Sequence, residues 1–174
     1  MTTISRSRMA RIVCGILVVF IVSSMAWGVG LCLKCKATPI DMPVSLTVGT
    51  VRTPEFFVKS TDYRIMLKVR RGLPLAQLQC LMGIRLHEGR DYCGYAHIAT
   101  AIAAEWKVWD GERIVAQGSV SGWSDKFAVS DDALEKYLGT FASEANKKYV
   151  LELTFTKDGT ALNEFKPRLI VEMY

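Results

Sequence analysis

The sequence predicts one all-β domain behind a single transmembrane helix. We expect an antiparallel β-sandwich of immunoglobulin-like or jelly-roll kind, with one or two short helices. Three observations support this prediction: an uncharged run of 22 residues near the start of the chain, later segments in which apolar and polar residues alternate, and Asp-Gly pairs after two of these segments. A chain of 174 residues is long enough for one domain of ordinary size.

The positive charge of the chain is confined to its N-terminal part. The chain holds 22 Lys and Arg against 17 Asp and Glu, a formal net charge of +5. Residues 1–36 contain five basic residues and no acidic one, so residues 37–174 contain 17 of each sign and are neutral. A neutral domain with mixed signs has no broad field that would capture a polyanion. We therefore expect no nucleic-acid partner.

Residues 12–33 are predicted to cross a membrane as one helix. A helix of this length is about 33 Å long, enough to span a hydrocarbon core of about 30 Å. Three arginines precede the run, at positions 6, 8 and 11, and place residues 1–11 in the cytoplasm. We expect a single-pass membrane protein whose C-terminal domain lies outside the cytoplasm.

The same run leaves a second interpretation open. Ser24-Met25-Ala26 would suit cleavage of a secretory signal, and residues 37–174 would then be exported without an anchor. Apolar residues continue for seven positions beyond this site, which favours an uncleaved helix. Ser24 and Gly28 have the small-xxx-small spacing through which two such helices would form a homodimer.

Residues 34–43 are predicted to be a linker, because they mix charges with two prolines and show no apolar period. The β-sandwich domain is then expected to occupy residues 44–174. Alternation predicts a strand that begins at Val44 and a further strand around Arg64. The second strand has a buried face made of Tyr63, Ile65, Leu67 and Val69.

Two Asp-Gly pairs predict turns between strands. Residues 104–109 and 113–120 flank the first pair and form a predicted hairpin, because Gly111 accepts the positive φ of such a turn. Residues 149–156 precede the second pair, and the chain returns as residues 168–174 after about ten residues, a length that leaves open a crossing between layers. Alternation in the earlier of these strands buries Tyr149, Leu151, Leu153 and Phe155.

Two short helices are expected. Pro74 would start the first, which would end at Gly83. Asp132 and Glu135 have the spacing of a capping box, and Gly139 would end the second helix after about two turns.

Cys80 and Cys93 are predicted to form a disulfide, because an exported domain folds in an oxidising compartment. The bridge would close a loop of about a dozen residues and stabilise the domain by about 3 kcal/mol. Together with His87 and His97, the two cysteines would alternatively form a zinc site, or Cys93 would act as a nucleophile with His97 as base. The spacing matches no common zinc motif, and oxidation removes both thiols, so we expect neither a metal nor another cofactor.

Two groups of side chains are candidates for binding a partner. Arg64, Lys68 and Arg70 would share the outward face of one strand as a basic stripe. The alternative is an edge strand that charge protects from aggregation. Trp109, beside the Asp-Gly turn, and Trp123 are candidate aromatic anchors, with capping of the sandwich as their alternative role.

No catalytic residue is assigned, because the sequence contains no nucleophile elbow, phosphate-binding loop or dinucleotide fingerprint. Residues 12–33, 106–111, 149–153 and 167–171 give the chain a layout that resembles bacterial envelope proteins in which a membrane helix displays a β-sandwich, some of them similar to immunity proteins that neutralise a periplasmic toxin. The resemblance implies a place in the bacterial inner membrane, with residues 1–11 in the cytoplasm and the C-terminal domain in the periplasm. We expect a non-enzymatic module that recognises another protein in the periplasm, in immunity or envelope assembly. An envelope hydrolase that uses the Cys80–His97 region is the alternative.

Overall fold

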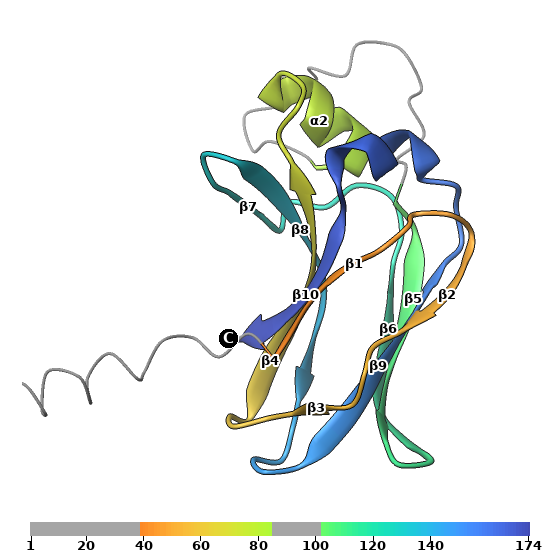
Figure 1. Ribbon diagram of the computed structural model, residues 1–174, viewed down its shortest axis with the longest axis vertical. Coiled ribbons are helices and arrows are strands. Elements are labelled where there is room, and N and C mark those ends of the chain that lie inside the picture. Colours follow the sequence, from red (N-terminus) through yellow and green to blue (C-terminus); the bar gives the residue numbers. More distant parts are fainter. Residues whose placement is uncertain (1–38, 85–101) are drawn as a thin grey trace, which may run out of the picture. The chain divides into compact units, whose positions relative to one another are not determined.

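The computed structural model describes residues 39–84 and 102–174, which form two antiparallel β-sheets packed face to face (Figure 1). Sheet A has the strand order β1-β10-β4-β8-β7 and sheet B the order β2-β9-β5-β6, with β3 paired to β9. This arrangement confirms the predicted all-β antiparallel sandwich. The strands are β1 (Ile40–Pro43), β2 (Gly49–Arg52), β3 (Phe56–Phe57), β4 (Asp62–Arg70), β5 (Ala104–Asp110), β6 (Arg113–Val120), β7 (Phe127–Val129), β8 (Ala133–Ala142), β9 (Lys148–Phe155) and β10 (Arg168–Met173).

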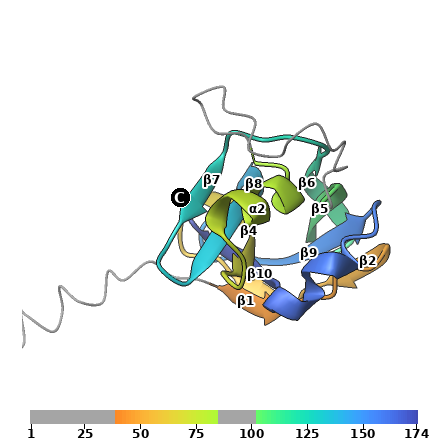
Figure 2. The same ribbon diagram turned by 90° about the horizontal axis from the view of Figure 1, so that it is seen from above.

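Two short helical segments, α2 (Leu75–Met82) and the 3-10 helix η1 (Thr160–Phe165), cover one end of the sandwich (Figure 2). The first confirms the predicted helix: Pro74 precedes it, and Gly83 ends it in the left-handed conformation at φ 66°. The second lies in the connection from β9 to β10. Because β9 belongs to sheet B and β10 to sheet A, this connection is a crossing between layers.

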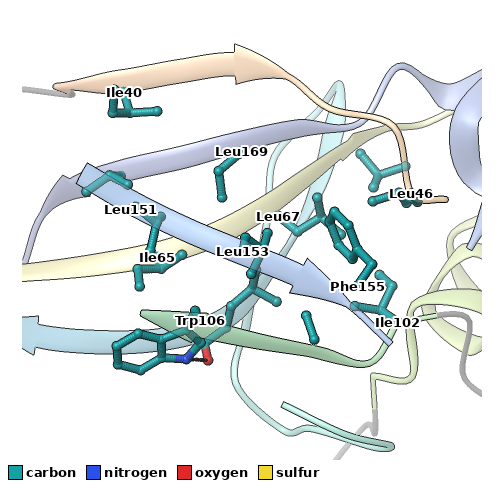
Figure 3. Packing of buried hydrophobic residues seen from close by; sticks show 14 of the residues in the cluster. Ile40, Leu46, Ile65, Leu67, Ile102, Trp106, Leu151, Leu153, Phe155 and Leu169 are labelled. Atoms are coloured by element: carbon teal, nitrogen blue, oxygen red, sulfur yellow. Dashed lines mark hydrogen bonds between the residues drawn. The ribbon is translucent and has the colours of Figure 1, made fainter. Parts of the chain in front are cut away.

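The core lies between the sheets and is built from the alternating residues of the central strands (Figure 3). The side chains predicted to be buried on β4 and β9 are all at most 3% exposed. The β5–β6 hairpin is confirmed as well, with Gly111 at φ 60° in its turn. Burial of each large apolar side chain contributes about 1.5–3 kcal/mol, so this pattern accounts for most of the attraction between layers.

The second predicted helix, residues 132–139, is wrong because residues 133–139 belong to strand β8. This strand is paired on both sides, with β4 and with β7, and Ala133 and Leu134 are completely buried. The capping-box spacing is not used: Asp132 accepts a hydrogen bond from the Ser130 hydroxyl instead. Long-range pairing and burial therefore override a local helix signal of about two turns.

The boundary predicted between linker and domain also differs from the structure. Residues 40–43 form strand β1, which pairs with β10, whereas residues 44–48 form no strand. Proline is tolerated in β1 because this strand lies at the edge of sheet A, and Pro43 is its last residue. A four-residue edge strand is too short to show a period of two, which is why the sequence suggested a linker.

No helix in residues 39–84 or 102–174 is long and apolar enough to cross a membrane. The predicted span, residues 12–33, lies outside these described residues.

The Trp106 side chain joins the two sheets where β6 runs beside β8 (Figure 3). Its indole Nε1 donates a hydrogen bond to the carbonyl oxygen of Leu138 at 3.0 Å. The ring lies against two glycines: a Cβ atom on Gly139 would be 2.4 Å from it, and one on Gly118 would be 2.5 Å away. The indole fits between the layers only because both neighbours lack a side chain.

A β-bulge supplies the carbonyl group that the indole binds. Ile65 pairs with Gly139, but the next residue of β4, Met66, pairs with Tyr137. Leu138 is therefore the extra residue of β8, and a bulge leaves such a residue outside the regular ladder. The Trp106 N–H provides the hydrogen-bond donor at this position.

We expect Gly139→Ala to lower the free energy of unfolding by about 1–3 kcal/mol, because the new methyl group overlaps the indole ring. Thr140→Ala on the neighbouring exposed residue is the control, with an expected change below about 0.5 kcal/mol. Urea unfolding followed by tryptophan fluorescence measures both. Equal stabilities of the two variants would show that the ring moves aside freely.

Candidate functional site

The outward face of β4 carries the residues predicted to form a basic stripe. Arg64, Lys68 and Arg70 alternate with the buried residues of this strand and point away from the core. The alternative of a charge-protected edge strand is wrong, because β4 lies between β10 and β8 in the middle of sheet A. The basic residues therefore have neighbours on both sides.

Carboxylates from those neighbouring strands pair with part of the stripe. Lys68 lies 3.6 Å from Glu135 of β8, and Arg64 forms an ion pair with Glu172 of β10. A third pair joins Arg168 of β10 to Asp41 of β1 at 2.5 Å. The stripe is thus one part of a mixed charged surface.

Arg64 is the most enclosed of the three predicted residues. Its guanidinium donates to the Tyr137 hydroxyl at 2.9 Å and lies 5.4 Å from the centre of that ring. It also lies 5.9 Å from the ring of Tyr174. With the Glu172 ion pair, these contacts occupy the guanidinium within the protein, so Arg64 is poorly placed to meet a partner directly.

A hollow of about 320 Å³ opens on this outer face between β1, β10, β4 and β8. Its walls carry four basic and four acidic side chains around one apolar residue, Ile170. We call the four basic residues the cation cluster: Lys68, Arg70, Lys166 and Arg168. The acidic residues are Asp41, Asp132, Glu135 and Glu172.

Half of the cation cluster has no ion pair. Lys68 and Arg168 have the carboxylate partners given above, whereas Arg70 and Lys166 form no ion pair within the described residues. Lys68 and Arg168 are also direct cross-strand neighbours. Like charges directly opposite each other destabilise a sheet. The hollow thus holds four basic and four acidic side chains, and two of the basic ones form no ion pair within the described residues.

Lys166 has an unusual backbone conformation. It follows η1 with φ 51° and ψ 62°, the left-handed region that glycine occupies most easily. A lysine held there costs about 1–2 kcal/mol relative to an ordinary conformation. The structure therefore keeps a cationic side chain at this point of the hollow at some cost to stability.

One acidic residue of the hollow, Asp132, is held in its ionised form by its neighbours. The pKa of Asp132 is lowered, first by the hydrogen bond from the Ser130 hydroxyl and then by the positive charges of Lys68 and Arg70. Asp132 is exposed, so solvent screens these interactions and their contribution to stability is small. A ligand that enters the hollow would therefore contact the Asp132 carboxylate beside the cations.

The predicted aromatic anchors lie away from this hollow. Trp109 is on β5 of sheet B, half-buried, with the Arg52 guanidinium 6.0 Å from its ring. Its Nε1 is buried and has no hydrogen-bond partner among the described residues. Trp123 is in the loop between β6 and β7 and is 37% exposed. The structure does not bring either tryptophan together with the basic stripe.

Cys80 lies on α2 and is 2% exposed. It is not a free thiol. His87, Cys93 and His97 lie outside the described residues, so the pairing of Cys80 with Cys93 and the two alternative uses of this region stay predictions. Within the described parts of the chain, no group of three or more metal-ligating side chains comes together.

Lys136 is a buried cation at the end of the sandwich that α2 covers. It faces inward from β8 and is completely buried. Its Nζ donates to the carbonyl oxygens of Met82 at 2.7 Å, Gly83 at 3.3 Å and Gly122 at 2.9 Å. The first two belong to the C-terminal end of the helix, where the helix dipole favours positive charge. Lys136 thus ties α2 to the loop that leads from β6 to β7.

Comparison with known proteins supports the fold and no more. No family model matches the chain, and no curated protein matches it. A crystal structure of a protein from Sulfurospirillum deleyianum is similar, with a TM-score of 0.54 over 79% of this chain and 98% of that chain. The two sequences are 9% identical, so the likeness concerns the β-sandwich alone.

Sequence reasoning found Lys68 and Arg70 but missed the other walls of the hollow. Arg168 and Glu172 alternate with buried residues in β10 as the stripe does in β4, so the same signal was present there. Which strands are neighbours is not visible in a local pattern. No sequence signal marks the left-handed conformation of Lys166.

Burial without a carboxylate partner lowers the pKa of Lys136 from 10.5 to about 8. The unfolded chain therefore binds more protons than the folded protein between pH 8 and pH 10.5. Stability is expected to rise with pH across this window, by up to about 3 kcal/mol in all.

Lys136→Met tests this expectation in urea unfolding at pH 7.5, 9 and 10. The variant should lose the rise with pH, and it should also be less stable at pH 9 because three buried carbonyl groups lose their donor. A wild-type stability that falls from pH 7.5 to 9 would contradict the assignment.

Proposed function

We propose that this protein is a non-enzymatic binding module that recognises another protein in the bacterial periplasm, in an immunity or envelope-assembly role. The membrane helix of residues 12–33 would hold the module at the inner membrane, and the outer face of sheet A would receive the partner. The hollow with its cation cluster is the observation that carries this proposal. It is open, charged and attached to a rigid central strand, as a recognition surface requires.

Two features support binding over catalysis. The polar groups of the hollow are ion pairs and single cations, with no neighbouring nucleophile and base among its walls. The mixed charges also suit protein recognition, because charge complementarity gives specificity and speeds association. The alternative of a metal- or Cys/His-dependent hydrolase uses the Cys80–His97 region, of which residues 85–97 lie outside the described part of the chain.

Site-specific photocrosslinking in cells tests where a partner lies. A photoreactive amino acid is placed at Asp131 or Glu164, two exposed positions beside the hollow, in the full-length chain. The controls are Gln117 and Ser119 on exposed positions of β6 in sheet B. We expect one defined protein adduct from the first pair and none from the second. Equal labelling from both faces, or no adduct from the rim of the hollow, would refute the proposal.

The proposed location makes a separate prediction. In the full-length chain, a reporter fused after Tyr174 should be active only when it is exported, and Cys80 and Cys93 should resist alkylation until a reductant is added. Mass spectrometry of peptides cut without reductant should show the two cysteines linked. A cytosolic reporter, or two freely alkylated cysteines, would contradict the exported location.

A further inference from the structure

We propose that the hollow binds an extended acidic segment of the partner, whose carboxylates sit on the cation cluster. This inference rests on the proposed function and names the chemistry that the partner must present. It starts from Arg70 and Lys166, the two members of the cation cluster that form no ion pair within the described residues; Asp132 is the acidic neighbour whose carboxylate feels the charge of Arg70.

The spacing of the cations fits an extended peptide. Lys68 and Arg70 are two residues apart on one face of β4, which places their Cα atoms about 6.8 Å apart. Alternate residues of an extended peptide have the same separation, so acidic residues at positions i and i+2 would meet both cations. The planar guanidinium of Arg70 would hold a carboxylate by two parallel hydrogen bonds.

Lys166 supplies independent support. Glycine would adopt the left-handed conformation at a lower cost in free energy. The backbone N–H of Lys166 donates a hydrogen bond to the Asn163 carbonyl at 3.1 Å, and this bond does not depend on the side chain. The ammonium group of Lys166 takes no part in the turn or in the core. A residue that costs stability without a structural contact is a sign of a functional constraint.

The acidic walls favour a carboxylate over a phosphate. Asp41, Asp132 and Glu135 surround the cations, and the lowered pKa of Asp132 keeps it charged. A phosphate places nearly two negative charges at one point beside these carboxylates, whereas the two carboxylates of an extended segment lie about 6.8 Å apart.

The experiment measures binding of a fluorescent peptide of alternating Glu and Ser to the full-length chain in detergent, by fluorescence anisotropy at about 0.15 M salt. We expect Arg70→Gln and Lys166→Gly each to weaken binding several-fold, and the double variant at least about tenfold. Lys59→Gln with Lys157→Gln is the matched control, since both lysines are exposed and lie outside the hollow, and it should bind like the wild type.

Lys166→Gly distinguishes recognition from folding. Because glycine relieves the left-handed conformation, this variant should unfold at the same or a higher urea concentration while it binds the peptide less well. A variant that is both unstable and weak would instead show that Lys166 has a structural role and would overturn this part of the argument.

The remaining outcomes separate this inference from the proposed function. Unchanged peptide affinity in the double variant overturns the acidic-segment inference. So does tighter binding of polyphosphate or of vesicles of anionic phospholipid than of the peptide, since that result assigns phosphate chemistry to the hollow. If the peptide does not bind but the crosslinked partner is still found at Asp131 and Glu164, the inference fails and the proposed function stands.

Discussion

The hydrogen bond from the Trp106 indole to the Leu138 carbonyl is the contact on which the arrangement of the two sheets depends. It joins β5 of sheet B to β8 of sheet A across an interface that the apolar core fills. Gly118 and Gly139 give the ring its space, so the contact fixes how closely β6 and β8 approach. A large aromatic side chain in such a position contributes several kcal/mol, about what its truncation would cost.

The same bulge that provides the Leu138 carbonyl shapes the outer face of sheet A. Because β8 has one residue more than β4 at this point, Tyr137 pairs with Met66 and reaches Arg64 with its hydroxyl group. Two residues earlier, Glu135 pairs with Lys68. The β-bulge in β8 therefore shapes both the core contact on the inner side of sheet A and the charged surface on its outer side. The packing beneath the outer face holds the cation cluster in place.

Strands with a long alternating pattern could be predicted from sequence, and the parts that depend on distant pairing could not. β4, β9 and the β5–β6 hairpin carry their own period or turn signal. β8 does not, because Lys136 stands among its inward residues and a capping-box spacing precedes it. The hollow combines β1, β4, β8 and β10, which are up to about 130 residues apart, so only half of its cation cluster was recognised.

A surface that already pairs most of its charges binds differently from a uniformly basic one. An incoming carboxylate must compete with Asp41 and Glu135 for Arg168 and Lys68, so these contacts exchange one ion pair for another and add little affinity. Net attraction then comes from Arg70 and Lys166, while the paired residues repel a segment whose charges are out of register. Such a face would distinguish between partners more by where their charges lie than by how many charges they carry. In the proposed periplasmic location, such a balanced face would not bind an anionic membrane through its charge alone.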